Sequence, residues 1–235
     1  MNLLKLRHDL GKFSNKQQAK ILQGFFKTGP GEYAQGDIFL GVKVPLLRSL
    51  AKQCQELAFN ETLKLLKSPI HEERFLSLLI LMLKYRQSHL SGQKRIYKAY
   101  LKHSRYINNW DLVDVSAKHI IGDFLANRDR KTLYQLAKSG SLWERRIAIL
   151  STFHFIENND FRDTLKIAKI LITDSHDLMH KAVGWMLREV GKRDVANEER
   201  FLKKYCRVMP RTMLRYAIER FPDSKRQQYL RGFNL

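Results

Sequence analysis

A helical pattern that recurs about every 36 residues is the feature that most constrains the fold of this chain. Five segments share a plan in which a polar or charged first turn leads into an apolar stretch with helical spacing. Arg74, Trp110, Arg146 and Lys181 occupy comparable places in four of them, 36, 36 and 35 residues apart. The segments are HEERFLSLLILMLKY (71–85), NNWDLVDVSAKHIIGDFL (108–125), LWERRIAILSTFHFI (142–156), LMHKAVGWMLREVGKRD (178–194) and MPRTMLRYAIERF (209–221).

Shorter helical segments such as DRKTLYQLAKSG (129–140) and FRDTLKIAKILITD (161–174) lie between them and complete helix pairs. Helix pairs with this period predict an all-α fold, an α-solenoid of HEAT-like (ARM-type) repeats. A plain helical bundle is the alternative. We expect one domain over residues 1–235, with residues 1–30 as an N-terminal helical segment. Equivalent helices of a solenoid share one side, so their charged starts would form a concave basic face.

The charge of the chain indicates the kind of partner. Its 43 Lys and Arg residues outnumber 23 Asp and Glu residues, which gives a formal net charge of +20. Such an excess favours a polyanion, with nucleic acid ahead of an anionic membrane surface. Cys54 and Cys206 form no CxxC motif, so we expect an intracellular, cytoplasmic protein that joins the nucleoid when bound to DNA. No apolar run reaches the roughly 18 residues of a membrane span, and the N-terminus does not resemble a signal peptide.

The segment HKAVGWMLREVGKRD (180–194) combines an aromatic residue with cations on one helix face. Lys181, Trp185 and Arg188 follow a spacing of i, i+4 and i+7. Such a stripe can bind nucleic acid, because the cations contact phosphates and the indole offers a flat surface to a sugar or base. A core tryptophan flanked by cations that extend along apolar surface is an equally good interpretation.

Two other motifs concern anions and metals. In LWERRIAIL (142–150), one of Arg145 and Arg146 can clamp a phosphate, although a surface ion pair with Glu144 is the alternative. HDLMH (176–180) has the histidine spacing of a metalloprotease helix, but Asp177 replaces the usual Glu and no third ligand is evident. We therefore predict no metal site and no cofactor.

The stretch NNWDLVD (108–114) contains the strongest candidate for chemistry. Asp111 fits the first turn of a helix, where the helix dipole favours an acid. Asp114 lies a turn further, on the face of Trp110. A carboxylate among cations would repel a polyanion, so its presence is costly unless it acts on a positive charge. An internal salt bridge is the alternative.

Together, these motifs resemble the AlkD-like DNA alkylation repair family, the HEAT-repeat DNA glycosylases. The resemblance covers roughly residues 35–230 and includes FLGVKVPLLRSLAK (39–52). It implies an enzyme of base excision repair that removes positively charged alkylated purines, such as 3-methyladenine and 7-methylguanine, from double-stranded DNA. It also implies that the lesion is held without a base-reading pocket. We expect a monomer that needs no membrane and no obligate protein partner.

The resemblance also assigns roles to individual residues. It implies that Asp114 is the catalytic acid and that Trp110 and Trp185 lie beside the lesion. It also implies that Arg146 and Arg188 bind phosphate. Their positions at the helix starts make Lys181, Arg145 and Arg74 further DNA-binding candidates. The alternatives are a non-catalytic DNA- or RNA-binding HEAT-repeat protein, and a protein-interaction scaffold that would leave the charge unexplained.

Overall fold

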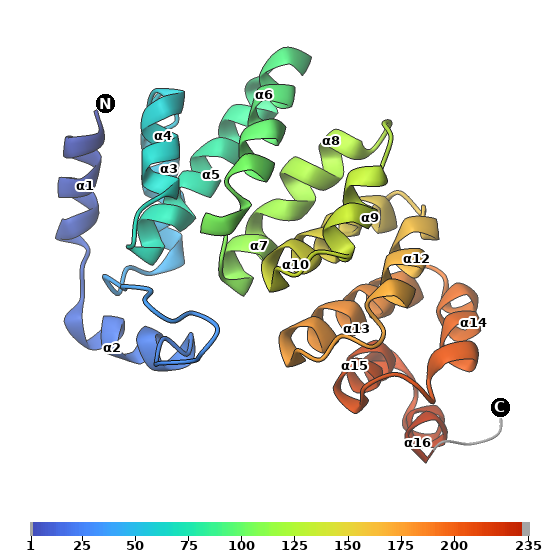
Figure 1. Ribbon diagram of the computed structural model, residues 1–235. Coiled ribbons are helices and arrows are strands. Elements are labelled where there is room, and N and C mark those ends of the chain that lie inside the picture. Colours follow the sequence, from blue (N-terminus) through green and yellow to red (C-terminus); the bar gives the residue numbers. More distant parts are fainter. Residues whose placement is uncertain (1, 232–235) are drawn as a thin grey trace. The chain divides into compact units, whose positions relative to one another are not determined.

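The computed structural model describes residues 2–231, and over that range the chain is helical without a strand (Figure 1). The prediction of an all-α, helical-repeat fold is therefore confirmed. The chain divides between Ser116 and Ala117 into two compact units, which we describe in turn as unit 1 and unit 2. The concave basic face and the single domain over residues 1–235 stay predictions.

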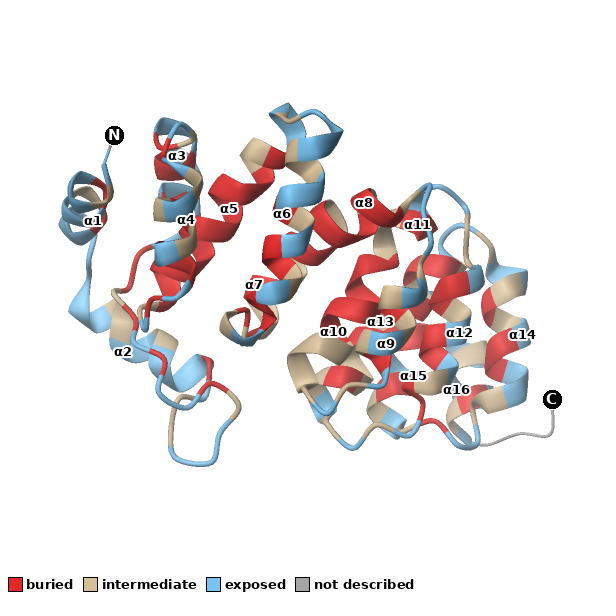
Figure 2. Ribbon diagram, turned by 45° about the horizontal axis from the view of Figure 1, so that its top comes forward, coloured by how far each residue is buried: buried red, intermediate tan, exposed pale blue. Residues whose placement is uncertain are grey.

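Unit 1 is built around one long buried helix, α5. It packs against α3, α4 and α6, so both of its sides are covered, and Figure 2 shows it buried over most of its length. Its apolar run LSLLILML is suited to such a position. The helices of the unit are α1 (Leu3–Lys12), α2 (Lys16–Phe25), α3 (Val44–Gln53), α4 (Phe59–Leu66), α5 (His71–Gln87), α6 (Leu90–Lys102), η1 (Ser104–Tyr106) and α7 (Trp110–Ala117).

The first turn of α5, which we call the HEER turn (71–74), is buried although all four of its residues are polar. Glu72 accepts hydrogen bonds from the backbone N–H groups of residues 40–42, at 2.8 to 3.2 Å. Glu73 forms a two-pronged ion pair with Arg7 of α1, with nitrogen–oxygen distances of 2.9 and 3.0 Å. One helical turn thus fastens both α1 and the loop before α3.

The other two residues of the HEER turn bind Asp37, whose side chain is 4% exposed. Arg74 lies 2.7 Å from Asp37 Oδ1 and also donates to the carbonyl of Ser68. The His71 ring contacts Asp37 through Nδ1 at 3.2 Å and Asp111 of α7 through Nε2 at 2.8 Å. Buried charges need such partners, because an unpaired one would cost several kcal/mol.

Unit 2 repeats the pairing of helices that the sequence predicts. Its central helix is α13, which packs against α10, α12, α14 and α15. The helices are η2 (Lys118–Gly122, a π-helical turn), α8 (Asp123–Leu125), α9 (Lys131–Ala137), α10 (Leu142–Ser151), α11 (Phe153–Glu157), α12 (Arg162–Ile170), α13 (Asp177–Gly191), α14 (Val195–Tyr205), α15 (Arg211–Ala217), η3 (Ile218–Arg220) and α16 (Asp223–Arg231).

Two glycines allow the helices of unit 2 to approach closely. A side-chain carbon on Gly122 would lie 2.3 Å from the carbonyl oxygen of Ser151 in α10. One on Gly184 of α13 would lie 2.4 Å from the carbonyl oxygen of Met213 in α15. Both distances are far below van der Waals contact, so these positions require glycine because the neighbouring backbone occupies the space.

Glu198 of α14 is a buried carboxyl group that has no ion-pair partner in the part of the chain that the structure describes. Its side chain packs against Gly191 at the end of α13, the residue is 2% exposed, and Oε1 has no hydrogen-bond partner among the described residues. Burial, followed by the charge of Glu199, raises the pKa of Glu198 to about 8, against the smaller opposing effects of Lys225 and Arg188. Near neutral pH the group therefore keeps its proton.

None of the described helices is long and apolar enough to cross a membrane.

Candidate functional site

The start of α7 is fixed by side-chain hydrogen bonds. Asn109 Oδ1 accepts from the backbone N–H of Trp110 at 2.8 Å, and Asp111 Oδ1 accepts from that of Leu112 at 2.8 Å. Asp111 lies in the first helical turn, as the sequence predicts, and its other oxygen is bound to His71. The helix that carries Trp110 and Asp114 is therefore held by its first residues.

Trp110 lies at the edge of an aromatic cluster in unit 1. Its ring stacks on Phe26, with centroids 5.2 Å apart and an interplanar angle of 23°, and meets the edge of Phe25 at 6.0 Å. The indole is only partly buried, so one part of it is packed and another remains accessible.

Asp114 lies one turn after Trp110 on α7 and is also partly exposed. Its charge reaches Tyr100, a buried residue that shares a hydrogen bond of 2.9 Å with Ser116. Burial raises the pKa of Tyr100, the Ser116 hydrogen bond opposes this rise, and the negative charge of Asp114 adds to it. Asp114 thus stands at the border between a buried interior and solvent.

The buried Asp37–His71–Asp111 array supports the start of α7 and was not foreseen from the sequence. Burial alone would lower the pKa of His71, but its hydrogen bonds with Asp111 and Asp37 raise it overall. For Asp37, burial favours the neutral form, yet His71 and the charge of Arg74 lower the pKa overall. The array is therefore an ion cluster that connects α5 to α7. The sequence signal that could have predicted it is the run of four polar residues, HEER, directly before the apolar part of α5.

Unit 1 also contains a cavity of about 190 Å³ that we call the phenylalanine cavity. Its walls are mainly apolar, and its polar lining residues are Gln18, Lys43, His71, Glu72 and Asp111. The lining residues come from four separate parts of the chain, which explains why no single motif predicted it. They are Gln18, Leu22, Phe25, Phe26, Phe39, Val42, Lys43, Val44, Leu47, His71, Glu72, Phe75 and Asp111.

Arg74 does not occupy the surface position that the sequence suggested. Its side chain is 3% exposed and is bound to Asp37 and to the carbonyl of Ser68. The guanidinium group neutralises an interior carboxylate, and DNA binding by Arg74 stays a prediction. The helical spacing was correct, but spacing alone does not show which side of a first turn faces the core.

The arginines at the start of α10 lie in unit 2 and are largely engaged within it. Arg145 Nε forms an ion pair with Asp174 at 2.6 Å. Arg146 is 4% exposed and donates from Nη1 to the carbonyl of Leu178 in the first turn of α13, at 2.6 Å. These contacts connect α10 to α13 and its preceding loop. Phosphate binding by Arg145 or Arg146 stays a prediction.

Lys181, Trp185 and Arg188 share α13, as the sequence predicts. Lys181 pairs with Asp177 at 2.7 Å, with 40% of its side chain exposed, and Arg188 pairs with Glu219 of η3. Trp185 is partly buried, and the edge of its ring faces Phe153 with centroids 5.8 Å apart. The structure shows features of both alternatives, because the side chain of Lys181 reaches solvent on the helix surface and Trp185 packs against Phe153.

The indole of Trp185 is oriented by a buried carboxylate. Its Nε1 donates to Glu189 Oε1 at 3.1 Å, and Lys192 contacts the same oxygen at 2.6 Å. Glu189 is 5% exposed and also lies 3.7 Å from Arg193. The residue one turn after Trp185 therefore fixes the ring, a role that the sequence analysis did not assign.

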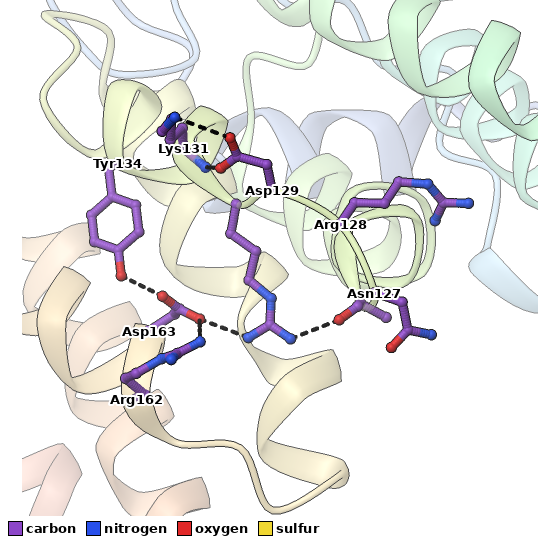
Figure 3. A pocket seen from close by; sticks show the side chains of 9 residues that line it. Asn127, Arg128, Asp129, Lys131, Tyr134, Arg162 and Asp163 are labelled. Atoms are coloured by element: carbon purple, nitrogen blue, oxygen red, sulfur yellow. Dashed lines mark hydrogen bonds and ion pairs between the residues drawn. The ribbon is translucent and has the colours of Figure 1, made fainter.

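A second, more polar pocket lies around residues 126–131 of unit 2 (Figure 3). Figure 3 shows Tyr134 and Arg162 directed at Asp163, and Lys131 beside Asp129. Burial would raise the pKa of Asp163, but the hydrogen bonds from Tyr134 and Arg130 lower it overall. Both carboxylates of the pocket are paired, Asp163 with Arg130 and Asp129 with Lys131, so they stabilise the local structure.

The two histidines of HDLMH act as hydrogen-bonding groups around the start of α13. His176 Nδ1 accepts from the backbone N–H of Leu178 at 3.1 Å, and His180 Nε2 contacts the carbonyl of Asp174 at 2.5 Å. The described residues contain no group of three potential ligands that could hold a metal ion.

The fold and these side chains define a strongly basic protein of paired helices, in which each unit has a partly exposed tryptophan on a helix with charged residues. Comparison with known families gives the more specific result. The chain belongs to the DNA alkylation repair enzyme family, whose model matches residues 6–221.

A solved structure supports the fold. The chain is similar to a predicted DNA alkylation repair enzyme from Enterococcus faecalis, with a TM-score of 0.69 and 17% sequence identity. The match covers 89% of this chain and 97% of that one. No curated protein matches the chain. Family membership thus places the chain in DNA alkylation repair.

Proposed function

We propose that the chain is a DNA glycosylase that hydrolyses the N-glycosidic bond of cationic alkylated purines in duplex DNA. The observation that carries this proposal is the position of Asp114, a partly exposed carboxylate one turn from the partly exposed Trp110, in a chain with a net charge of +20. A carboxylate of this kind opposes DNA binding, and stabilising a positive charge that forms during the reaction offsets that cost.

The chemistry needs such a charge stabiliser. When the bond between C1′ and the base nitrogen breaks, its electron pair moves onto the purine and cancels the positive charge there. The sugar becomes an oxocarbenium-like cation until water adds at C1′ and releases a proton. Asp114 stabilises this cation and orients the water, as carboxylates do in glycoside hydrolysis. Trp110 and Trp185 contribute cation–π contacts of about 0.5–2 kcal/mol each.

The decisive experiment is single-turnover release of 7-methylguanine from a duplex. We expect Asp114→Asn to slow release by about 10²–10³, the range for a preorganised charge stabiliser. Trp185→Ala should cost tenfold or less, because about 1.4 kcal/mol corresponds to tenfold in rate. Asp129→Asn is the matched control, since it removes a carboxylate whose side chain is 65% exposed. Equal rates for the wild type and Asp114→Asn would refute the catalytic role.

DNA binding by α13 is tested separately. We expect Lys181→Gln to flatten the log–log salt dependence of DNA affinity by about one unit, because each phosphate contact releases about one counterion. Lys131→Gln is the control, since Lys131, like Lys181, has a solvent-accessible side chain that pairs with an aspartate in its own segment. An unchanged slope in Lys181→Gln removes this residue from the phosphate contacts.

The alternative is a DNA- or RNA-binding repeat protein without catalysis. The charge of the chain favours binding of both nucleic acids equally, so it does not distinguish this alternative. Free base released by the wild type rejects it, whereas salt-dependent binding without released base supports it.

A further inference from the structure

The phenylalanine cavity has no part in the proposed reaction at C1′, yet it has the features of a binding site. Half of its apolar lining residues are phenylalanines, and two of these, Phe39 and Phe75, are 5% and 4% exposed. Phe26 and Phe39 lie nearly parallel, with centroids 5.1 Å apart and an interplanar angle of 16°. Flat walls of this kind accommodate a planar ring better than a branched aliphatic chain.

The polar lining indicates which planar molecule would fit. Glu72, Asp111 and His71 line the cavity, and His71 Nε2 contacts Asp111 at 2.8 Å. Each Asp111 oxygen accepts one hydrogen bond, from the Leu112 N–H or the His71 ring, and a carboxylate oxygen can accept a second. Glu72 already accepts from the backbone N–H groups of residues 40–42, so Asp111 is the main acceptor left for a ligand that donates N–H groups.

The size of the cavity sets a further limit. A cavity of about 150 Å³ is sufficient for benzene, and the phenylalanine cavity measures about 190 Å³. One planar base therefore fits if its edge extends to the mouth. Phe25 and Val44 line the cavity and are 62% and 42% exposed, so the mouth is open to solvent.

The helix beside the mouth is lightly packed. None of the residues of α2 is fully buried, and Figure 2 shows it in the colours of intermediate and exposed residues. It is held at its start, where Asn15 N–H donates to the Leu40 carbonyl at 2.8 Å. A side-chain carbon on Gly41 would lie 2.2 Å from the carbonyl oxygen of Asn15. An anchored start and a lightly packed remainder allow small adjustments of α2 around a ligand.

We propose that the phenylalanine cavity binds a planar purine base, and that its occupant is the alkylated base after release from DNA. Cleavage leaves the electron pair of the glycosidic bond on the base, so the freed base is uncharged, planar and supplied with N–H donors. These properties match the phenylalanine rings of the wall and the Asp111 acceptor. The identity of the occupant rests on the proposed glycosylase function, whereas the affinity for a planar base rests on the cavity alone.

The test uses direct calorimetric titration of the protein with free 3-methyladenine. We expect saturable binding that Val44→Trp weakens tenfold or more, because the indole occupies the mouth. Val195→Trp is the matched control, since Val44 and Val195 are both the first residue of a helix and are 42% and 50% exposed. Asp111→Asn should weaken binding about tenfold, as expected when a charged hydrogen-bond acceptor becomes neutral.

A second arm distinguishes the free base from a base still attached to DNA. It titrates the protein with a duplex that contains 7-methylguanine on a 2′-fluorinated sugar, which slows glycosidic cleavage. We expect Val44→Trp to reduce affinity for the free base and to leave affinity for this duplex within about twofold. If the duplex affinity falls as much as that of the free base, the cavity holds a base still attached to DNA and the released-base assignment is overturned.

The outcomes separate the two proposals. No binding of 3-methyladenine, or equal weakening by Val44→Trp and Val195→Trp, overturns the cavity proposal. A protein that binds the free base but releases none from DNA retains the cavity and loses the glycosylase function. A protein that releases base from DNA but does not bind the free base retains the glycosylase function and loses the cavity proposal.

Discussion

Glu198→Gln should make unit 2 more stable at neutral and alkaline pH and remove a pH dependence from its unfolding. The folded protein holds the proton of Glu198 up to about pH 8, whereas the unfolded chain loses it near 4.5. Between these values the folded state binds more protons, so the free energy of unfolding decreases as the pH rises. The difference in pKa corresponds to about 5 kcal/mol at most, since each unit is worth about 1.4 kcal/mol.

Gln resembles the protonated carboxyl group in shape but does not ionise. We therefore expect the wild type and Glu198→Gln to unfold with similar free energies near pH 4.5 and to separate progressively, with a difference of roughly 3–4 kcal/mol by pH 7.5. Urea unfolding by linear extrapolation measures this difference at each pH. Trp143 and Trp185 report on unit 2 by fluorescence if Trp110 is replaced by Phe in every variant.

The control for Glu198→Gln is Glu199→Gln. Glu199 is the next residue of α14, but it forms an ion pair with Lys225 and its side chain is 22% exposed. Its replacement should not abolish the pH dependence. If Glu198→Gln unfolds with the same pH profile as the wild type, Glu198 is already ionised in the folded protein and the reasoning from burial fails.

Three further predictions concern other buried contacts. Asp37→Asn should destabilise unit 1 by about 3–5 kcal/mol, because it leaves Arg74 charged and unpaired in the interior, and urea unfolding monitored by Trp110 fluorescence checks this. Glu189→Ala should shift the Trp185 emission to longer wavelength because the indole loses its fixed N–H partner, and unchanged emission contradicts that role. Gly184→Ala should lower the melting temperature by several degrees although alanine favours helices, and a higher value in thermal unfolding contradicts the close approach to α15.

The repeat could be predicted from the sequence because its signal is local and redundant. Five segments carry the same pattern of a charged start and an apolar face; α5, α7, α10 and α15 begin within them, and α13 begins one residue before its segment. Pro45 lies in the first turn of α3 and Pro69 lies between α4 and α5, which are positions that proline favours. Hydrophobic period and helix-start residues act within one or two turns, so the sequence alone displays them.

The partners of charged side chains could not be predicted in the same way. Arg74 binds Asp37, and Arg145 binds Asp174, contacts that span 37 and 29 residues. Helical spacing places a residue on a face but does not show whether that face meets solvent or another helix. The cavity was missed for a related reason, because its lining residues are brought together only by the packing of separate helices around α5.

The HEER turn has a practical consequence for any shortened form of this protein. Glu73 has a side chain that is only 4% exposed, and its ionic partner Arg7 comes from α1. A chain that starts after α1 would leave this carboxylate in the interior with no counter-charge, so it should be hard to express unless Glu73 is changed to Gln at the same time. The family match begins at residue 6, one position before Arg7, so a fragment cut to that boundary retains the pair.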